Sequence, residues 1–211
     1  MLKLKIIVGS TRAGRNADAV LHWLLPLARS HGAFEVETLD LRDWPLPFFQ
    51  ETIATVGDFA NPTYSEPIVK QWNDKIGEAD AYIIVTPEYN HSIPAVLKNA
   101  IDSVFFSFRF RQKPVAFLGY SLAATAAARA VEHLTQIMVE TEAVPVRTTT
   151  LLPFVTNAFD AAGAPKDPGL AVTLEAMLTD LAWLGNALQL ARAAGQLPPA
   201  SLRIRAAYGR K

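Results

Sequence analysis

Residues 5–16 read KIIVGSTRAGRN, and this stretch decides the fold. The apolar run at residues 6–8 is typical of a β-strand and stops at Gly9, where a loop with two hydroxyls and two arginines follows. A helical pattern begins after Asn16, which is a suitable N-cap. Backbone N–H groups near a helix N-terminus favour a bound anion. The stretch therefore predicts a strand, an anion-binding loop and a helix.

Strand-like and helix-like segments alternate along the rest of the chain. The segments AYIIV at 81–85 and PVAFL at 114–118 are apolar throughout, which is typical of strands covered on both faces. Five strand–helix repeats predict an α/β fold, a doubly wound, five-stranded parallel sheet with helices on both faces. We expect strands at Lys3–Val8, Ala33–Leu41, Ala81–Val85, Pro114–Leu118 and Val144–Thr148, and helices at Ala17–Ser30, Ile68–Glu78, Ala95–Phe105, Ala123–Glu142 and Leu170–Ala194.

The pattern indicates one domain at residues 1–195, followed by a tail at residues 196–211. The tail is expected to be mobile or to pack on another subunit. Residues 42–67 are expected to form a long irregular loop, because four prolines and several aromatic residues interrupt any regular pattern. Such loops are commonly lids, binding loops or interfaces, and the apolar side chains favour contact with a ligand or a partner chain.

The composition excludes several classes of protein. The 211 residues include 20 basic and 20 acidic side chains, a balance that predicts no nucleic-acid partner. The chain has no cysteine, which excludes disulfides, thiol catalysis and cysteine-based metal sites. Its four histidines lack metal-ligand spacing, so no metal site is expected. With no signal-peptide pattern and no apolar run of membrane-spanning length, we expect a cytoplasmic protein without a membrane partner.

Three loops are expected to meet at one edge of the sheet. Ligands of doubly wound sheets bind beyond the carboxyl ends of the strands, where the strand order reverses. The loops at residues 9–16, 86–94 and 119–125 follow the first, third and fourth expected strands. Each loop alone also fits a solvated turn, but their convergence favours a binding site. The first offers side chains to an anion, and the second offers a tyrosine face and backbone amides to a planar ring.

Other motifs fit these loops poorly. Gly9 and Gly14 have the spacing of a P-loop, but no lysine followed by serine or threonine completes it, and a G-x-G-x-x-G fingerprint is absent. The sequence GYSLA at residues 119–123 is similar to a nucleophile elbow, which would make Ser121 a hydrolase nucleophile. That fold requires an acid and then a histidine later in the chain. His133 is the only later histidine and lies within the next expected helix, so the hydrolase is disfavoured.

The segments GSTRAGR, TPEYNHSIPAVLKNAIDSV, KPVAFL and ARAVEHL together resemble the NAD(P)H-dependent FMN reductase family of flavodoxin-like proteins, which includes quinone and azo-dye reductases. The resemblance covers residues 3–150. It implies homodimers or homotetramers, with the flavin near a subunit interface. It also implies FMN as cofactor, with the phosphate on Ser10, Thr11, Arg12, Arg15 and Asn16, the ring against Pro87, Glu88, Tyr89 and Asn90, and the far side of the ring near Tyr120 and Ser121.

The resemblance implies that hydride passes from NAD(P)H through FMN to a small-molecule acceptor such as a quinone, an azo compound or free flavin. The flavin carries this chemistry, so no catalytic side chain is expected. A flavin-binding or accessory protein without turnover is the alternative.

Two departures from the family pattern lie in the loops. Arg15 takes a position that is often serine in the family, so the phosphate would depend more on this arginine. The third loop of the family is approximately Y-G-G-x-x-G-G-x-R, whereas residues 120–129 read YSLAATAAAR. Either the following helix starts earlier and the flavin shifts slightly, or the added Cβ atoms weaken FMN binding or suit another planar ligand.

Overall fold

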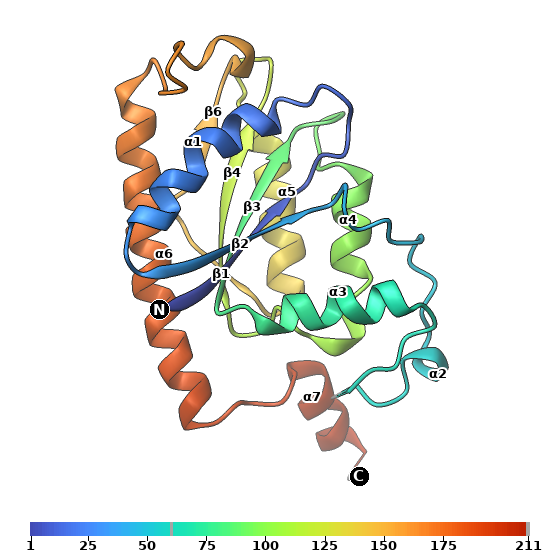
Figure 1. The fold of residues 1–211 in the computed structure, drawn as a ribbon. Helices are drawn as coiled ribbons and strands as arrows, with labels where there is room; N and C mark the ends of the chain where they lie inside the picture. The colour runs from blue at the N-terminus through green and yellow to red at the C-terminus, as the bar shows by residue number, and fades with distance from the viewer. Residues whose placement is uncertain (60, 210–211) are drawn as a thin grey trace.

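The computed structural model describes residues 1–59 and 61–209, and its centre is a parallel sheet (Figure 1). The strand order is β2-β1-β3-β4-β5, and β6 pairs with β4 as well. The order reverses between β1 and β3, which is the arrangement of a flavodoxin-like fold and confirms the expected fold class. The strands are β1 (Leu2–Val8), β2 (Phe34–Asp40), β3 (Ala81–Pro87), β4 (Pro114–Tyr120), β5 (Val144–Pro145) and β6 (Thr150–Leu152).

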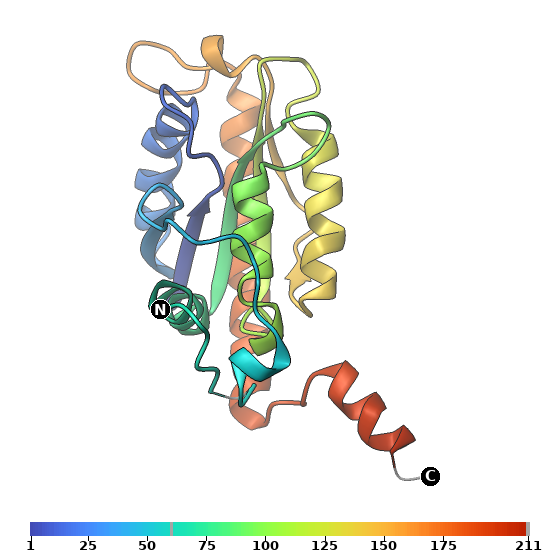
Figure 2. The same cartoon turned by 90° about the vertical axis from the view of Figure 1, so that its right-hand side faces the viewer.

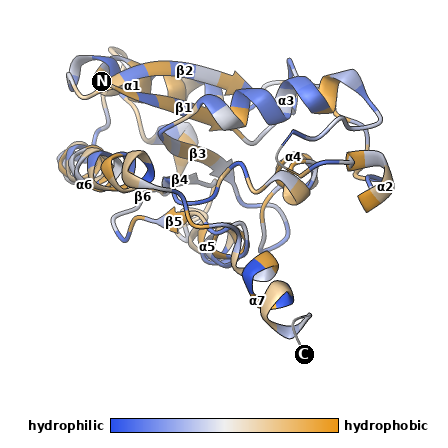
Figure 3. Ribbon diagram, turned by 90° about the horizontal axis from the view of Figure 1, so that it is seen from below, coloured by the Kyte–Doolittle hydropathy of each residue, from blue (hydrophilic) through white to orange (hydrophobic). Residues whose placement is uncertain are grey.

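Helices cover both faces of this sheet. Figure 3 shows α1 (Ala17–Ser30) and α6 (Pro168–Ala194) on one side of the strands. The other side carries α3 (Pro67–Glu78), α4 (Ala95–Asp102) and α5 (Ala128–Glu140). All four residue pairs between β3 and β4 from Ile83 to Thr86 are parallel, so the loops after these strands leave at the same edge. Figure 2 shows these loops together at the upper end of the molecule.

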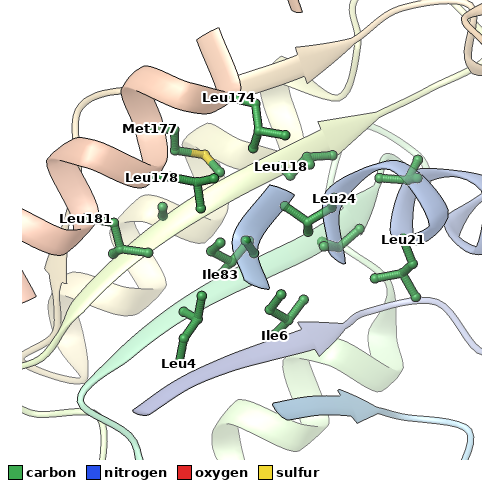
Figure 4. Packing of buried hydrophobic residues seen from close by; sticks show 14 of the residues in the cluster. Leu4, Ile6, Leu21, Leu24, Ile83, Leu118, Leu174, Met177, Leu178 and Leu181 are labelled. Carbon is green, nitrogen blue, oxygen red and sulfur yellow. The ribbon is translucent and has the colours of Figure 1, made fainter. Parts of the chain in front are cut away.

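The hydrophobic core lies in two layers because side chains of a strand alternate between its faces. Ile6 points into the layer under α1 and α6, and its neighbour Ile7 points into the layer under α3, α4 and α5. Figure 4 shows the first layer, where strand residues meet leucines of α1 and α6. Both side chains are fully buried, which explains why the central strands are apolar throughout.

The fifth strand differs from the prediction. A single strand at Val144–Thr148 was expected, but two short strands, β5 and β6, pair with β4 at separate places. Pro145 has no N–H to donate to the ladder, so pairing with β4 stops there and resumes at Thr150.

The helix after β4 also differs from the prediction. It was expected to start at Ala123, but α5 begins at Ala128. Ala126 and Ala127 have φ angles of 52° and 68°, in the left-handed region, and residues in this conformation cannot belong to a right-handed helix. The loop after β4 therefore extends to residue 127. The helix before it, α4, ends at Asp102 rather than Phe105, and a short 3-10 turn at Phe105–Ser107 follows.

The stretch at residues 42–67 is less irregular than expected. It contains a short helix, α2 (Ile53–Val56), whose N-terminus is capped by Thr52. Val56 and Tyr64 pack with Val69 of α3 in a small cluster of their own. In the tail, residues 200–208 form α7 (Ala200–Tyr208), which has no buried residue and projects from the body in Figure 2. No helix among the described residues is long and apolar enough to cross a membrane.

Candidate functional site

The three loops meet in a cavity of about 500 Å³ at the carboxyl edge of the sheet. Its walls come from the ends of β1, β3 and β4 and from the start of α5. Thr11 alone among the expected site residues lies elsewhere, in a neighbouring groove with Leu41 and Trp44. The expected residues that line the cavity are Ser10, Arg12, Arg15, Asn16, Pro87, Glu88, Tyr89, Asn90, Tyr120 and Ser121.

The first and second loops are joined by hydroxyl groups. Ser10 is fully buried, and its Oγ lies 2.9 Å from the Tyr89 hydroxyl. The Arg12 guanidinium lies 5.7 Å from the centre of the Tyr89 ring, in a cation–π contact. A Cβ on Gly9 would lie 2.9 Å from Leu97 and 3.1 Å from a backbone oxygen of β3, so glycine is required where the first loop leaves the sheet. The two loops thus form one wall of the cavity.

Arg15 is held by two carboxylates. Its side chain is buried, and Nη1 donates to Asp40 over 2.7 Å while Nε donates to Asp18 over 2.9 Å. Burial opposes ionisation of Asp40, but hydrogen bonds from Arg15 and from the backbone N–H of Arg42 hold the pKa of Asp40 below its usual value. Nη1 of Arg15 also donates to the Ser10 carbonyl. The charge of Arg15 is therefore balanced within the protein, and its contacts fix the shape of the first loop.

The second loop is fastened to α5. Asn90 and His91 have φ angles of 49° and 65°, and Tyr89 pairs with Ser92 across them. Arg129, in the first turn of α5, donates from Nε to a Glu88 oxygen over 2.7 Å. Its Nη1 lies 2.8 Å from Nε2 of His91. These contacts hold the strained backbone of the second loop against the third.

The third loop approaches β4 closely. A Cβ on Gly119 would lie 3.0 Å from the carbonyl oxygen of Ala126, so a side chain at residue 119 would push the loop away. Ala126 and Ala127 are buried and take the backbone conformation that glycine adopts most easily. Leu122 lines the cavity with 67% of its surface exposed.

Comparison with known proteins identifies the family. The model of the family described as NADPH-dependent FMN reductase matches residues 2–157. This chain belongs to the NADPH-dependent FMN reductase family. An NAD(P)H-dependent FMN reductase of Pseudomonas aeruginosa is 33% identical over 168 residues, which cover 77% of this chain and 83% of that protein. One of Schizosaccharomyces pombe is 32% identical over 118 residues, 56% of this chain and 57% of that protein. The expectation of an FMN-dependent NAD(P)H oxidoreductase family is thereby confirmed.

Solved structures show the same fold. The NAD(P)H:acceptor oxidoreductase FerB of Paracoccus denitrificans has a TM-score of 0.71, with 23% identity over 89% of this chain and 98% of that one. An azoreductase of Bacillus anthracis has a TM-score of 0.58, with 17% identity over 89% of this chain and all of that one. Relatives of this family member also include a protein named 2-hydroxy-1,4-benzoquinone reductase.

The cavity of this FMN reductase family member fits a ligand with a polar edge. The Tyr120 hydroxyl and Oε2 of Glu88 are buried and have no hydrogen-bond partner among the described residues. The Tyr120 hydroxyl lies near Ser10 but outside hydrogen-bond geometry. Burial raises the pKa of Tyr120 above its ordinary value, so the hydroxyl stays protonated and can donate. Unpaired buried polar groups are rare and costly, by about 1–3 kcal/mol each. Both residues line the cavity, so the donor set fits FMN.

The serine hydrolase alternative is not supported by the geometry. The Ser121 hydroxyl donates to the Ala123 carbonyl over 2.9 Å, in a turn of its own loop. Nδ1 of His133 lies 3.0 Å from Oγ of Ser92 instead. Among the residues that the structure describes, Ser121 therefore has no base beside it.

Sequence reasoning missed two residues that organise the site, Arg129 and Asp40. Arg129 occupies the arginine of the third-loop pattern, and that signal could have marked it. Asp40 follows the alternating pattern of the second strand and carried no such signal. Its role depends on β2 lying beside β1, where Val8 and Asp40 are partners.

Proposed function

We propose that this protein oxidises NAD(P)H as co-substrate and passes the electrons through bound FMN to a small-molecule acceptor such as a quinone, an azo compound or free flavin. The observation that carries this proposal is the cavity in which the three loops of an FMN reductase family member converge. FMN, when bound, supplies the ability to accept a hydride and to release electrons to a second substrate. The protein supplies placement and charge.

The first loop is the proposed phosphate site. Ser10, Arg12 and Asn16 line the cavity at the start of α1, where backbone N–H groups favour an anion. Arg12 has no ion pair with a described carboxylate, so its charge is free to neutralise a phosphate. We assign Arg15 a supporting role because Asp18 and Asp40 already balance it. Thr11 lines the neighbouring groove and supports the loop from outside the cavity.

The second and third loops are the proposed ring site. Residues 87–90 form one side, with Pro87, Glu88, Tyr89 and Asn90, and the opposite side holds Tyr120 and Ser121. Tyr120 would donate its unpaired hydroxyl to a polar edge of the ring, and Glu88 is fixed by Arg129. No side chain is assigned to proton transfer, because hydride transfer to a flavin does not require one.

The proposal includes a homodimer or homotetramer in the cytoplasm. The stretch at residues 42–67 supports an assembly because Phe48 is 85% exposed and Ile53 is 62% exposed, beside an apolar groove near the first loop. We also propose that residues 1–195 form the flavodoxin-like domain and that residues 196–211 form a tail outside it.

The visible absorption spectrum of the purified protein, followed by anaerobic addition of NADPH, tests this function. We expect a flavin spectrum that is bleached by NADPH and restored by a quinone. Arg12→Gln should weaken FMN binding by about tenfold, from loss of one charge-assisted hydrogen bond, whereas the exposed Arg147→Gln should not. Colourless protein that does not bind added FMN would overturn the proposal. Tight FMN binding without NAD(P)H oxidation would favour the flavin-binding alternative.

A further inference from the structure

A second polar cavity lies at the amino edge of the sheet. Its volume is about 220 Å³, and residues from the end of α3, from the segment before β4 and from the end of α6 line it. β3 and β4 have seven residues each, so this cavity lies roughly 20 Å from the carboxyl-edge site. In Figure 1 the end of α6 lies at the opposite end of the molecule from the loops after β1 and β3. The two cavities are therefore separate.

Positive charge exceeds negative charge around this cavity. Its lining includes Arg109, Arg111, Lys113 and Arg192, against Glu78 and Asp80. Both carboxylates are already engaged. Arg192 donates to Asp80 over 2.8 Å, and Glu78 accepts from Lys5 and Lys75, which lie outside the lining. A surplus of cations thus faces a confined space, which favours an anion.

Arg111 has unused donors at this cavity. Its Nε and Nη1 atoms are buried and have no hydrogen-bond partner among the described residues. Lys113 differs, because its Nζ donates to the carbonyls of Ile76 and Gly77 at the end of α3 and to the Tyr82 hydroxyl. A buried guanidinium with free N–H groups on one edge matches the paired oxygens of a phosphate or sulfate group.

We propose that this amino-edge cavity binds a tetrahedral oxyanion, a phosphate group, through the unpaired edge of Arg111. The remaining cations supply long-range attraction, and Arg192 and Lys113 keep their present partners. The volume suits one phosphate group but not a whole nucleotide, so the group is either a free ion or the projecting end of a larger molecule. The site is independent of the proposed cofactor site.

Calorimetric titration with inorganic phosphate, at constant ionic strength set with chloride, tests the proposal. The protein is first saturated with FMN so that the first loop is filled, and Arg12→Gln protein provides a second background that does not rely on FMN. We expect saturable binding that Arg111→Gln weakens by about tenfold or more, since a hydrogen bond to a charged group is lost. Arg147→Gln, an exposed arginine elsewhere, is the matched control.

Arg111→Lys retains the charge without the planar fork, and we expect binding between that of the wild type and that of Arg111→Gln. A phosphate monoester that binds as well as inorganic phosphate would identify the projecting end of a larger ligand, whereas a preference for inorganic phosphate would identify the free ion. Either result supports an oxyanion site. Absence of binding beyond the chloride control in both backgrounds, or equal binding by Arg111→Gln and wild type, overturns it.

Discussion

The hydroxyl of Ser10 lies 2.9 Å from the hydroxyl of Tyr89, although 79 residues separate them. This contact joins the loop after β1 to the loop after β3 across the point where the strand order reverses. The proposed phosphate site and ring site are therefore not independent. A ligand that orders one loop also orders the other.

Tyr89→Phe tests this coupling. The substitution removes the hydroxyl but keeps the ring under Arg12, so we expect FMN affinity to fall by about threefold to tenfold, from about 1 kcal/mol for one hydrogen bond. Quenching of FMN fluorescence on titration of the FMN-free protein measures the affinity. Tyr208→Phe, at an exposed position of α7, is the control and should match the wild type. Unchanged affinity in Tyr89→Phe would show that the hydroxyl contact does not couple the loops.

Ala126→Gly should stabilise the protein. Alanine in the left-handed region costs about 1–2 kcal/mol, and glycine relieves this strain at an entropic cost of about 0.5–1 kcal/mol. We therefore expect a gain of up to about 1 kcal/mol in the free energy of unfolding, measured with urea. Ala130→Gly in the right-handed turn of α5 is the matched control and should lose about 1 kcal/mol or more. A loss in both variants would contradict strain at Ala126.

Arg129→Gln should leave Glu88 buried without its cation. The Glu88 side chain is 6% exposed, so we expect the free energy of unfolding to fall by about 1–3 kcal/mol. In a double-mutant cycle, Glu88→Gln combined with Arg129→Gln should cost less than the sum of the two single changes. Strictly additive losses would mean that the pair contributes no coupling to the site.

The stability of the protein should depend on Lys113 above neutral pH. Burial and the neighbouring Arg192 lower the pKa of Lys113 to about 7, from an ordinary value of 10.5. Between these values the unfolded chain holds a proton that the folded chain lacks, so this group makes the free energy of unfolding rise with pH, by about 2 kcal/mol from about pH 7 to about pH 9. Below the folded pKa both states are protonated and the slope disappears.

Urea unfolding without phosphate measures this slope. Lys113→Met should remove most of it, because methionine does not titrate. Lys98→Met changes an exposed lysine paired with Asp102 and should keep the wild-type slope. The same pH slope in Lys113→Met and wild type would rule out the lowered pKa.

The sequence by itself determined the architecture and the place of the site. Apolar strands alternating with helices specify a doubly wound sheet because periodicity is a local property of the chain. Parallel strands place their carboxyl ends at one edge, so the convergence of the loops at residues 9–16 and 86–94 followed from the pattern without coordinates. The quoted segments also carried the family resemblance.

The tertiary structure decided which charges meet and which backbone the third loop adopts. Arg15 pairs with Asp40, and Arg129 with Glu88, because neighbouring strands and helices bring distant residues together, and spacing along the chain does not encode such pairs. The alanine run has a strong helical propensity, yet close packing of the loop against Gly119 accompanies left-handed conformations at Ala126 and Ala127. Propensity is a local preference of about 1 kcal/mol per residue, and packing across the fold can outweigh it.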